Sequence, residues 1–94
     1  MYLVSYDIVS DRLRNKIAKT LEGYGKRVQY SVFECDLTEK RYKELYQKLL
    51  TLVQDLEEGD ICFYYICKTC QRKKQVIGVP KSSDTYSEEN VIVI

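Results

Sequence analysis

Tyr2-Leu3-Val4-Ser5-Tyr6-Asp7 is an apolar, β-branched and aromatic run that ends in a carboxylate. Such a run predicts a well-buried strand. An ionised carboxylate costs several kcal/mol to bury without a partner or a metal ion, so Asp7 is the first candidate for chemistry. A second role stays open for Asp7, because an aspartate at the end of a strand also commonly caps the following turn.

A helix is predicted directly after this strand. Ser10 is a good N-cap, and the apolar residues after it recur at helical spacing. These residues are Leu13, Ile17, Ala18 and Leu21. Gly23 and Gly25 then end the helix.

The middle of the chain predicts a strand pair and a second helix. Residues 26–37 are extended in character but long for one strand, so we expect a bend or tight hairpin near Tyr30 and Ser31. Thr38 is the expected cap of the second helix. Its apolar stripe consists of Tyr42, Leu45, Tyr46, Leu49, Val53 and Leu56.

The C-terminal part is read as strand, connection, strand and tail. Residues 60–67 predict a strand, the basic residues 68–74 a connection, and residues 75–79 a strand closed by Pro80. Residues 81–90 are polar and behave as a linker. Residues 91–94, Val-Ile-Val-Ile, must pair with a sheet edge of their own chain or of a second subunit. We therefore expect a ferredoxin-like domain over residues 1–80. Residues 81–94 are expected to form a linker and a C-terminal strand that could be exchanged with the partner subunit.

This order of elements predicts an α+β protein with the ferredoxin-like βαββαβ plan, in which two helices cover one face of an antiparallel sheet. An extra C-terminal strand follows. The opposite sheet face is left bare, and a second sheet stacked on it by two-fold symmetry is the simplest cover. The expected assembly is a sheet-to-sheet homodimer.

The composition excludes several classes of function. A chain of 94 residues with 45% hydrophobic and 31% charged residues is expected to be one folded domain. It contains no His, which excludes His-based acid–base catalysis and His-ligated metals. It shows neither a membrane-length apolar run nor a signal peptide, so we expect a cytoplasmic protein with no membrane partner.

Basic residues gather in two segments although the net charge is only +1. Residues 12–27 contain Glu22 as their single acid, and residues 67–81 contain none. This segregation suggests a positive surface for a polyanion, although solvated charged faces remain an equal alternative. The candidate phosphate contacts are Arg12, Arg14, Lys16 and Arg27.

A divalent metal is the chemistry that Asp7 could support. One carboxylate is a poor site for Mg²⁺ or Mn²⁺, but two Asp7 side chains facing each other across a dimer axis could share an ion that binds phosphate and activates water. The Cys67-Lys-Thr-Cys70 motif suggests a small thiol or zinc protein instead. That signal is weak, because a zinc site needs four ligands.

Several segments together closely resemble the family of CRISPR-associated protein two. They are Tyr6-Asp7-Ile8, residues 11–17 (Asp-Arg-Leu-Arg-Asn-Lys-Ile), residues 24–35 (Tyr-Gly-Lys-Arg-Val-Gln-Tyr-Ser-Val-Phe-Glu-Cys) and Asp36-Leu37. The resemblance implies a ferredoxin-like homodimer whose C-terminal strand often crosses to the other subunit. It also implies that Asp7 is the metal-binding carboxylate and Tyr6 its neighbour in the catalytic site.

The resemblance further implies that Arg14 and Arg27 contact nucleic acid and that Phe33 is the accompanying aromatic. Lys16 departs from the pattern, since some nuclease-active relatives carry Arg there. The implied function is CRISPR adaptation by a Mg²⁺-dependent (or Mn²⁺-dependent) endonuclease acting on RNA or double-stranded DNA. The alternative is a non-catalytic, DNA-binding scaffold that bridges CRISPR integrase dimers, and the sequence does not separate the two.

Overall fold

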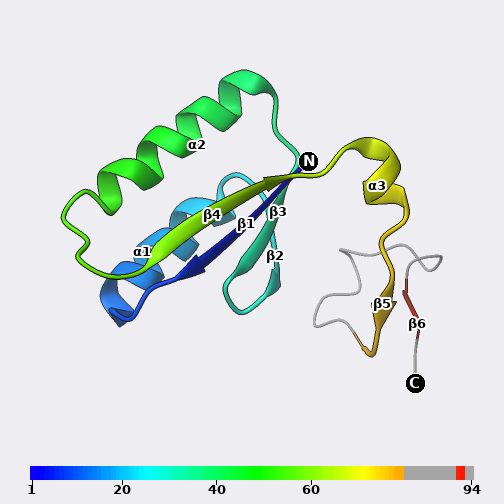
Figure 1. Cartoon of the computed structure of the whole chain (residues 1–94), viewed down its shortest axis with the longest axis horizontal. Coiled ribbons are helices and arrows are strands. Elements are labelled where there is room, and N and C mark those ends of the chain that lie inside the picture. The colour runs from blue at the N-terminus through cyan, green and yellow to red at the C-terminus, as the bar shows by residue number, and fades with distance from the viewer. Residues whose placement is uncertain (80–90, 93–94) are drawn as a thin grey trace.

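The computed structural model describes residues 1–79 and 91–92. Its elements are β1 (Tyr2–Asp7), α1 (Asp11–Glu22), β2 (Lys26–Gln29), β3 (Val32–Cys35), α2 (Glu39–Leu52), β4 (Asp60–Tyr65), α3 (Lys68–Arg72), β5 (Val76–Ile77) and β6 (Val91–Ile92). The first four strands form an antiparallel sheet in the order β2-β3-β1-β4 (Figure 1). The predicted ferredoxin-like α+β plan is therefore confirmed.

The two long helices begin at their predicted caps. The Ser10 hydroxyl accepts a hydrogen bond from the backbone N–H of Leu13, and the Thr38 hydroxyl accepts one from Arg41, both at 3.2 Å. Between α1 and β2 the chain passes close to β3, where a Cβ on Gly25 would lie 2.3 Å from the carbonyl oxygen of Glu34. A glycine is required at that position because any side chain would collide with the β3 backbone.

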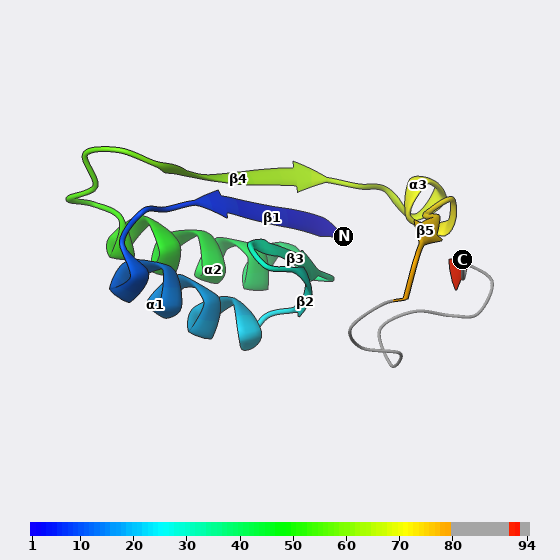
Figure 2. The ribbon, with the colours of Figure 1, turned by 90° about the horizontal axis from the view of Figure 1, so that it is seen from below.

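The core lies between the sheet and the helices α1 and α2, which pack on the same face of the sheet (Figure 2). We call this face the covered face. Its strands contribute Val4, Tyr6, Phe33 and Cys35, and its helices contribute Ile17, Ala18, Leu21, Leu45 and Leu49. Removing these apolar side chains from water is the main stabilising term for a domain of this size.

The opposite face, called here the open face, carries the alternate residues of each strand. Leu3 lies between Glu34 and Tyr64, Ser5 lies between Val32 and Cys62, and Asp7 lies beside Asp60. These side chains are half-buried or exposed, and Tyr64 keeps 55% of its surface in contact with solvent. The expected homodimer would cover this face and stays a prediction.

The C-terminal part differs from the sequence prediction in three ways. The strand predicted over residues 60–67 ends at Tyr65 in β4. Residues 68–74 were expected to form a plain connection, but the short helix α3 begins after Cys67, whose extended backbone serves as the N-cap. Five residues are too few to show an apolar period, so the pattern could not reveal it. The predicted strand over residues 75–79 shortens to β5.

The strand β5 does not join the four-stranded sheet. It pairs in parallel with β6, with Val76 opposite Val91 and Ile77 opposite Ile92. Val91 and Ile92 thus pair with a strand of their own chain. The predicted linker, residues 81–90, and the last residues 93–94 lie outside the described residues, and the exchange of the C-terminal strand between subunits stays a prediction.

None of the helices in the described part of the chain combines the length and apolar character needed to cross a membrane.

Candidate functional site

Asp7 is the last residue of β1 and is exposed on the open face of the sheet. Tyr6 points the other way, because successive side chains of a strand alternate between faces. It is 4% exposed within the core, and its hydroxyl donates a hydrogen bond to the carbonyl oxygen of Tyr30 at 3.4 Å. The structure therefore does not bring together the two side chains that the sequence placed in one catalytic site.

Asp60 is the residue that lies beside Asp7. The two face each other directly in the antiparallel register between β1 and β4. Gly59 makes this approach possible, since its φ of +113° suits glycine and a Cβ there would lie 2.5 Å from the carbonyl oxygen of Asp7. The sequence analysis did not single out Asp60. Its one local signal is the Gly-Asp pair at the start of a strand. Its position opposite Asp7 depends on the register between β1 and β4, which are far apart in the sequence.

This pair of carboxylates is a candidate ligand set for a hard divalent cation. Mg²⁺ typically takes one or two carboxylates and completes its shell with water and phosphate oxygens. Within residues 1–79, no group of three or more Asp, Glu, Cys or His side chains gathers around a common point. Asp7 and Asp60 of one chain therefore fit a site that is completed by solvent, by substrate or by a second copy.

Arg14 is held in the loop that follows Asp7. Its guanidinium donates hydrogen bonds to the carbonyl oxygens of Ile8 at 2.8 Å and Val9 at 3.2 Å, and it forms an ion pair with Asp11. Burial lowers the pKa of Arg14, but the charges of Tyr30 and Asp11 and hydrogen bonds to both raise the pKa by more. Several of the hydrogen-bond donors that Arg14 was predicted to offer to phosphate thus bind this loop instead.

The remaining basic candidates fall into two groups. Arg12 and Lys16 are exposed on α1, where their charges are accessible to a polyanion. Arg27 lies in β2 beside Phe33, with its guanidinium 5.2 Å from the centre of the Phe33 ring and within 3.4 Å of the Tyr6 hydroxyl, to which it donates. Arg27 is thus an exposed cation at the border of the covered face.

Phe33 has no exposed surface in this structure. It belongs to the core under α1 and α2, and the Tyr6 ring lies beside it with centroids 6.4 Å apart. The expectation that Phe33 contacts nucleic acid does not agree with this position, because a ring buried on all sides offers no face to a base. The exposed aromatic nearby is Tyr30, at the turn between β2 and β3, which is 67% exposed.

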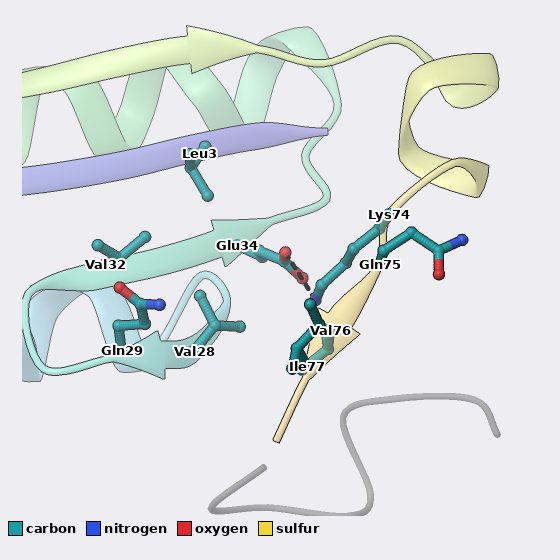
Figure 3. A pocket seen from close by; sticks show the side chains of 9 residues that line it. All are labelled: Leu3, Val28, Gln29, Val32, Glu34, Lys74, Gln75, Val76 and Ile77. Carbon is teal, nitrogen blue, oxygen red and sulfur yellow. Dashed lines mark ion pairs between the residues drawn. The ribbon is translucent and has the colours of Figure 1, made fainter. Parts of the chain in front are cut away.

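A pocket of about 410 Å³ lies at the other end of the open face, between the sheet and the segment that contains β5 (Figure 3). Its lining residues are Leu3, Val28, Gln29, Val32, Glu34, Lys74, Gln75, Val76 and Ile77. The Lys74 ammonium and the Glu34 carboxylate form an ion pair of 3.0 Å across it. This contact ties the C-terminal segment to β3.

The two cysteines of the motif are exposed free thiols at the start of α3. Hydrogen bonds from the backbone and side chain of Cys70 lower the pKa of Cys67, and the same neighbour relation raises the pKa of Cys70. The described residues add no further Cys, Asp or Glu to form a zinc site around them. Only the reactivity of the pair as thiols remains from that hypothesis.

Comparison with known proteins agrees with this architecture. A family model for CRISPR associated protein Cas2 matches residues 1–74. A relative from Chloroflexus aurantiacus, named CRISPR-associated endoribonuclease Cas2 1, is 48% identical over 92 residues that cover 97% of this chain and 98% of the relative.

Two solved structures share the fold. Cas2 of Streptococcus pyogenes has a TM-score of 0.71 and 30% identity, covering 82% of this chain and 98% of that one. A chain of a partial Cas6-RT-Cas1–Cas2 complex has a TM-score of 0.71 and 35% identity, covering 79% and 86%. With a family match over most of its length and a relative nearly half identical from end to end, this chain belongs to the Cas2 family of CRISPR-associated proteins.

Proposed function

We propose that this protein takes part in CRISPR adaptation as a Mg²⁺- or Mn²⁺-dependent endonuclease that hydrolyses phosphodiester bonds of RNA or double-stranded DNA. The observation that carries the proposal is the exposed carboxylate of Asp7 at the end of an inner strand of the sheet, with Asp60 directly opposite. Like charges directly opposite each other destabilise a sheet, so such a pair is best explained by a cation that neutralises it. The name of the relative from Chloroflexus aurantiacus, an endoribonuclease, agrees with this reaction.

The residues of this chain take distinct parts in the proposed reaction. Asp7 holds the metal ion, and Asp60 supports it. When bound, the ion supplies charge stabilisation for the phosphate and lowers the pKa of a coordinated water. Arg12 and Lys16 attract the polyanion, whereas Arg14 positions the loop after Asp7 through its bonds to the carbonyls of that loop.

A homodimer completes the proposed site. The open face exposes apolar and aromatic surface, including Tyr64 on β4, which is 55% exposed. Stacking two such faces by a two-fold axis would remove this surface from water and bring the acidic ends of two sheets near each other. Two Asp7 side chains could then share the metal ion.

The second candidate function is a non-catalytic scaffold that binds duplex DNA and bridges CRISPR integrase dimers. The observation that favours it is the likeness to a chain of a Cas6-RT-Cas1–Cas2 complex, an assembly in which a Cas2 protein accompanies Cas1. On this account the basic residues matter through phosphate contacts, and binding should weaken steeply as salt is raised.

A cleavage assay separates the two functions. Wild-type protein, Asp7→Asn and Asp36→Asn are incubated with RNA and with double-stranded DNA, with Mg²⁺ or with a chelator. Asp36 is an exposed aspartate that follows β3 at the opposite end of the sheet, so its variant carries the same change of charge. We expect cleavage by wild type and Asp36→Asn in Mg²⁺ only, and none by Asp7→Asn. Equal cleavage by Asp7→Asn would overturn the nuclease account, and salt-sensitive DNA binding without any cleavage would favour the scaffold.

A further inference from the structure

Tyr30 stands out as an exposed aromatic side chain at a functional end of the sheet. It occupies the turn between β2 and β3 and keeps 67% of its surface exposed. Exposing this much apolar ring costs burial free energy, and no part of the proposed hydrolysis uses it.

The turn lies beside the end of β1 that carries Asp7. The backbone N–H of Tyr6 donates to the carbonyl oxygen of Ser31 at 3.1 Å, and the Tyr6 hydroxyl donates to the carbonyl oxygen of Tyr30. Tyr6, the residue before Asp7, therefore holds the turn in place through two hydrogen bonds.

Arg14 links the ring of Tyr30 to the loop after Asp7. Its guanidinium carbon lies 6.0 Å from the centre of the Tyr30 ring, while its nitrogens bind the carbonyls of Ile8 and Val9. The carbonyl of Tyr30 is thus hydrogen-bonded and its ring lies beside a cation, which lowers the entropic cost of using the ring as a contact.

From this arrangement we infer that Tyr30 is a stacking platform for an unpaired nucleobase at the Asp7 end of the sheet. The inference rests on the proposed function, in that the nucleic acid must lie across this end of the sheet. A tyrosine ring can stack on any base and adds affinity without sequence preference. The ring needs an open base face, which a continuous duplex does not offer because each base is covered by its neighbours. The nearby cations Arg12, Lys16 and Arg27 would contact the phosphates.

The chain provides a matched control in Tyr65. It is also 67% exposed, but it lies at the far end of β4, opposite Tyr2 instead of opposite Asp7. Its ring meets the Tyr2 ring edge-on with centroids 5.2 Å apart. Replacing either tyrosine removes an equally exposed ring, so a difference in nucleic-acid binding between the two variants depends on the position of the ring and not on the loss of a tyrosine as such.

The test measures binding in a chelator, where no metal-dependent cleavage interferes. Wild type, Tyr30→Ala, Tyr30→Phe, Tyr30→Leu and Tyr65→Ala are titrated with a fluorescent single-stranded RNA, an equally long single-stranded DNA, a blunt duplex, and a single strand in which every base is missing. The salt concentration is held fixed, because phosphate contacts depend on it.

We expect Tyr30→Ala and Tyr30→Leu to weaken binding of both base-bearing single strands by roughly 5- to 100-fold. Neither variant should change binding of the abasic strand or the duplex. Tyr30→Phe should retain most of the affinity, since it keeps the ring and loses only the hydroxyl, and Tyr65→Ala should bind all four as wild type does. Tyr30→Leu guards against misfolding, because it preserves an apolar side chain in the turn.

Two results would overturn the inference alone: wild-type affinity in Tyr30→Ala, or an equal loss on base-bearing and abasic strands, which would indicate a change in the turn and not a lost stack. Cleavage that still depends on Asp7 would leave the proposed nuclease intact in both cases. If the wild-type protein binds none of the four nucleic acids, both the stacking platform and the proposed function fail.

Discussion

The covered and open faces of the sheet are built from the same strands but carry different kinds of side chain. On β1, Val4 and Tyr6 are at most 4% exposed under the helices. Leu3, Ser5 and Asp7, which alternate with them along the strand, are half-buried or exposed. The covered face is filled by this chain's own helices. The open face keeps a carboxylate pair, an ion pair and apolar surface accessible. Tyr6 and Asp7, adjacent in sequence, therefore belong to different parts of the molecule: one stabilises the fold, and the other is available for chemistry.

The largest effect that tests this comparison is expected for Phe33→Ala. Phe33 is fully buried, so the substitution removes the favourable free energy of burying its ring and leaves a cavity in the core. The free energy of unfolding should therefore fall by about 3 to 5 kcal/mol. Urea denaturation followed by circular dichroism measures it. The open-face control is Tyr64→Ala. Because Tyr64 is 55% exposed, this variant should lower the free energy of unfolding much less than Phe33→Ala does when both are measured at low protein concentration. Unchanged stability of Phe33→Ala with weakened nucleic-acid binding would mean that Phe33 faces the ligand after all.

A smaller effect is expected at the ion pair that ties the C-terminal segment to the open face. Glu34 and Lys74 keep only 21% and 24% of their side-chain surface exposed, so Glu34→Gln should cost about 1 kcal/mol and speed hydrogen exchange at residues 75–79. Exchange measured by mass spectrometry localises the change. Lys73→Met, at an exposed neighbouring cation, is the control. Identical exchange in Glu34→Gln and wild type would show that the contact does not hold the segment.

The carboxylate pair predicts a change of opposite sign. Asp60→Asn removes a like charge directly opposite Asp7 and should raise the free energy of unfolding by about 0.2 to 1 kcal/mol in a chelator. Added Mg²⁺ should stabilise wild type more than the variant, because a ligand that binds the folded state adds stability. Asp55→Asn, an exposed aspartate after α2, controls for net charge. A Mg²⁺ response that is the same in all three proteins would exclude Asp60 from the metal site.

The smallest perturbation is a pH-dependent labelling of the cysteines, which leaves the fold intact at short times. Burial and the charge of Glu34 raise the pKa of Cys35 on the covered face to about 11, so little thiolate forms near neutral pH. Cys67, whose pKa is lowered, carries more thiolate at any such pH. Iodoacetamide labelling between about pH 7 and 9, followed by mass spectrometry, should modify Cys67 first and Cys35 last. Cys62, on the open face, serves as the reference, and labelling of Cys35 as fast as Cys62 would contradict the assignment of faces.

Much of the fold was accessible from local signals. The caps at Ser10 and Thr38, the apolar spacing of α1 and the turn near Tyr30 all depend on residues close in sequence, and each prediction is confirmed. The apolar stripe of the second helix was expected to continue to Val53 and Leu56, but α2 ends at Leu52. The helix α3 was missed because it is too short to carry a periodic pattern, and β5 was placed too long because its partner, β6, comes from a distant segment.

The candidate site was only partly predictable. Asp7 was singled out because an ionised carboxylate is costly to bury without a partner or a metal ion, and its place in a catalytic site stays a prediction. Strand alternation could have indicated that Tyr6 points to the other face. Phe33 was named among the nucleic-acid contacts and Tyr30 only as a residue of the turn, because the sequence contains no direct record of which ring is buried. Arg14 was taken as a phosphate contact, although the structure gives its guanidinium to the loop carbonyls.

The amino-acid order alone settles the four strands of the main sheet, the two long helices with their caps, and the family, because these depend on spacing and short motifs that the chain carries locally. Only the folded chain decides that Asp60 lies opposite Asp7, that Phe33 is enclosed while Tyr30 is exposed, and that Lys74 reaches Glu34. The physical reason is that each of these contacts joins residues brought together by strand register and helix packing, and register is a property of paired segments and not of either segment by itself.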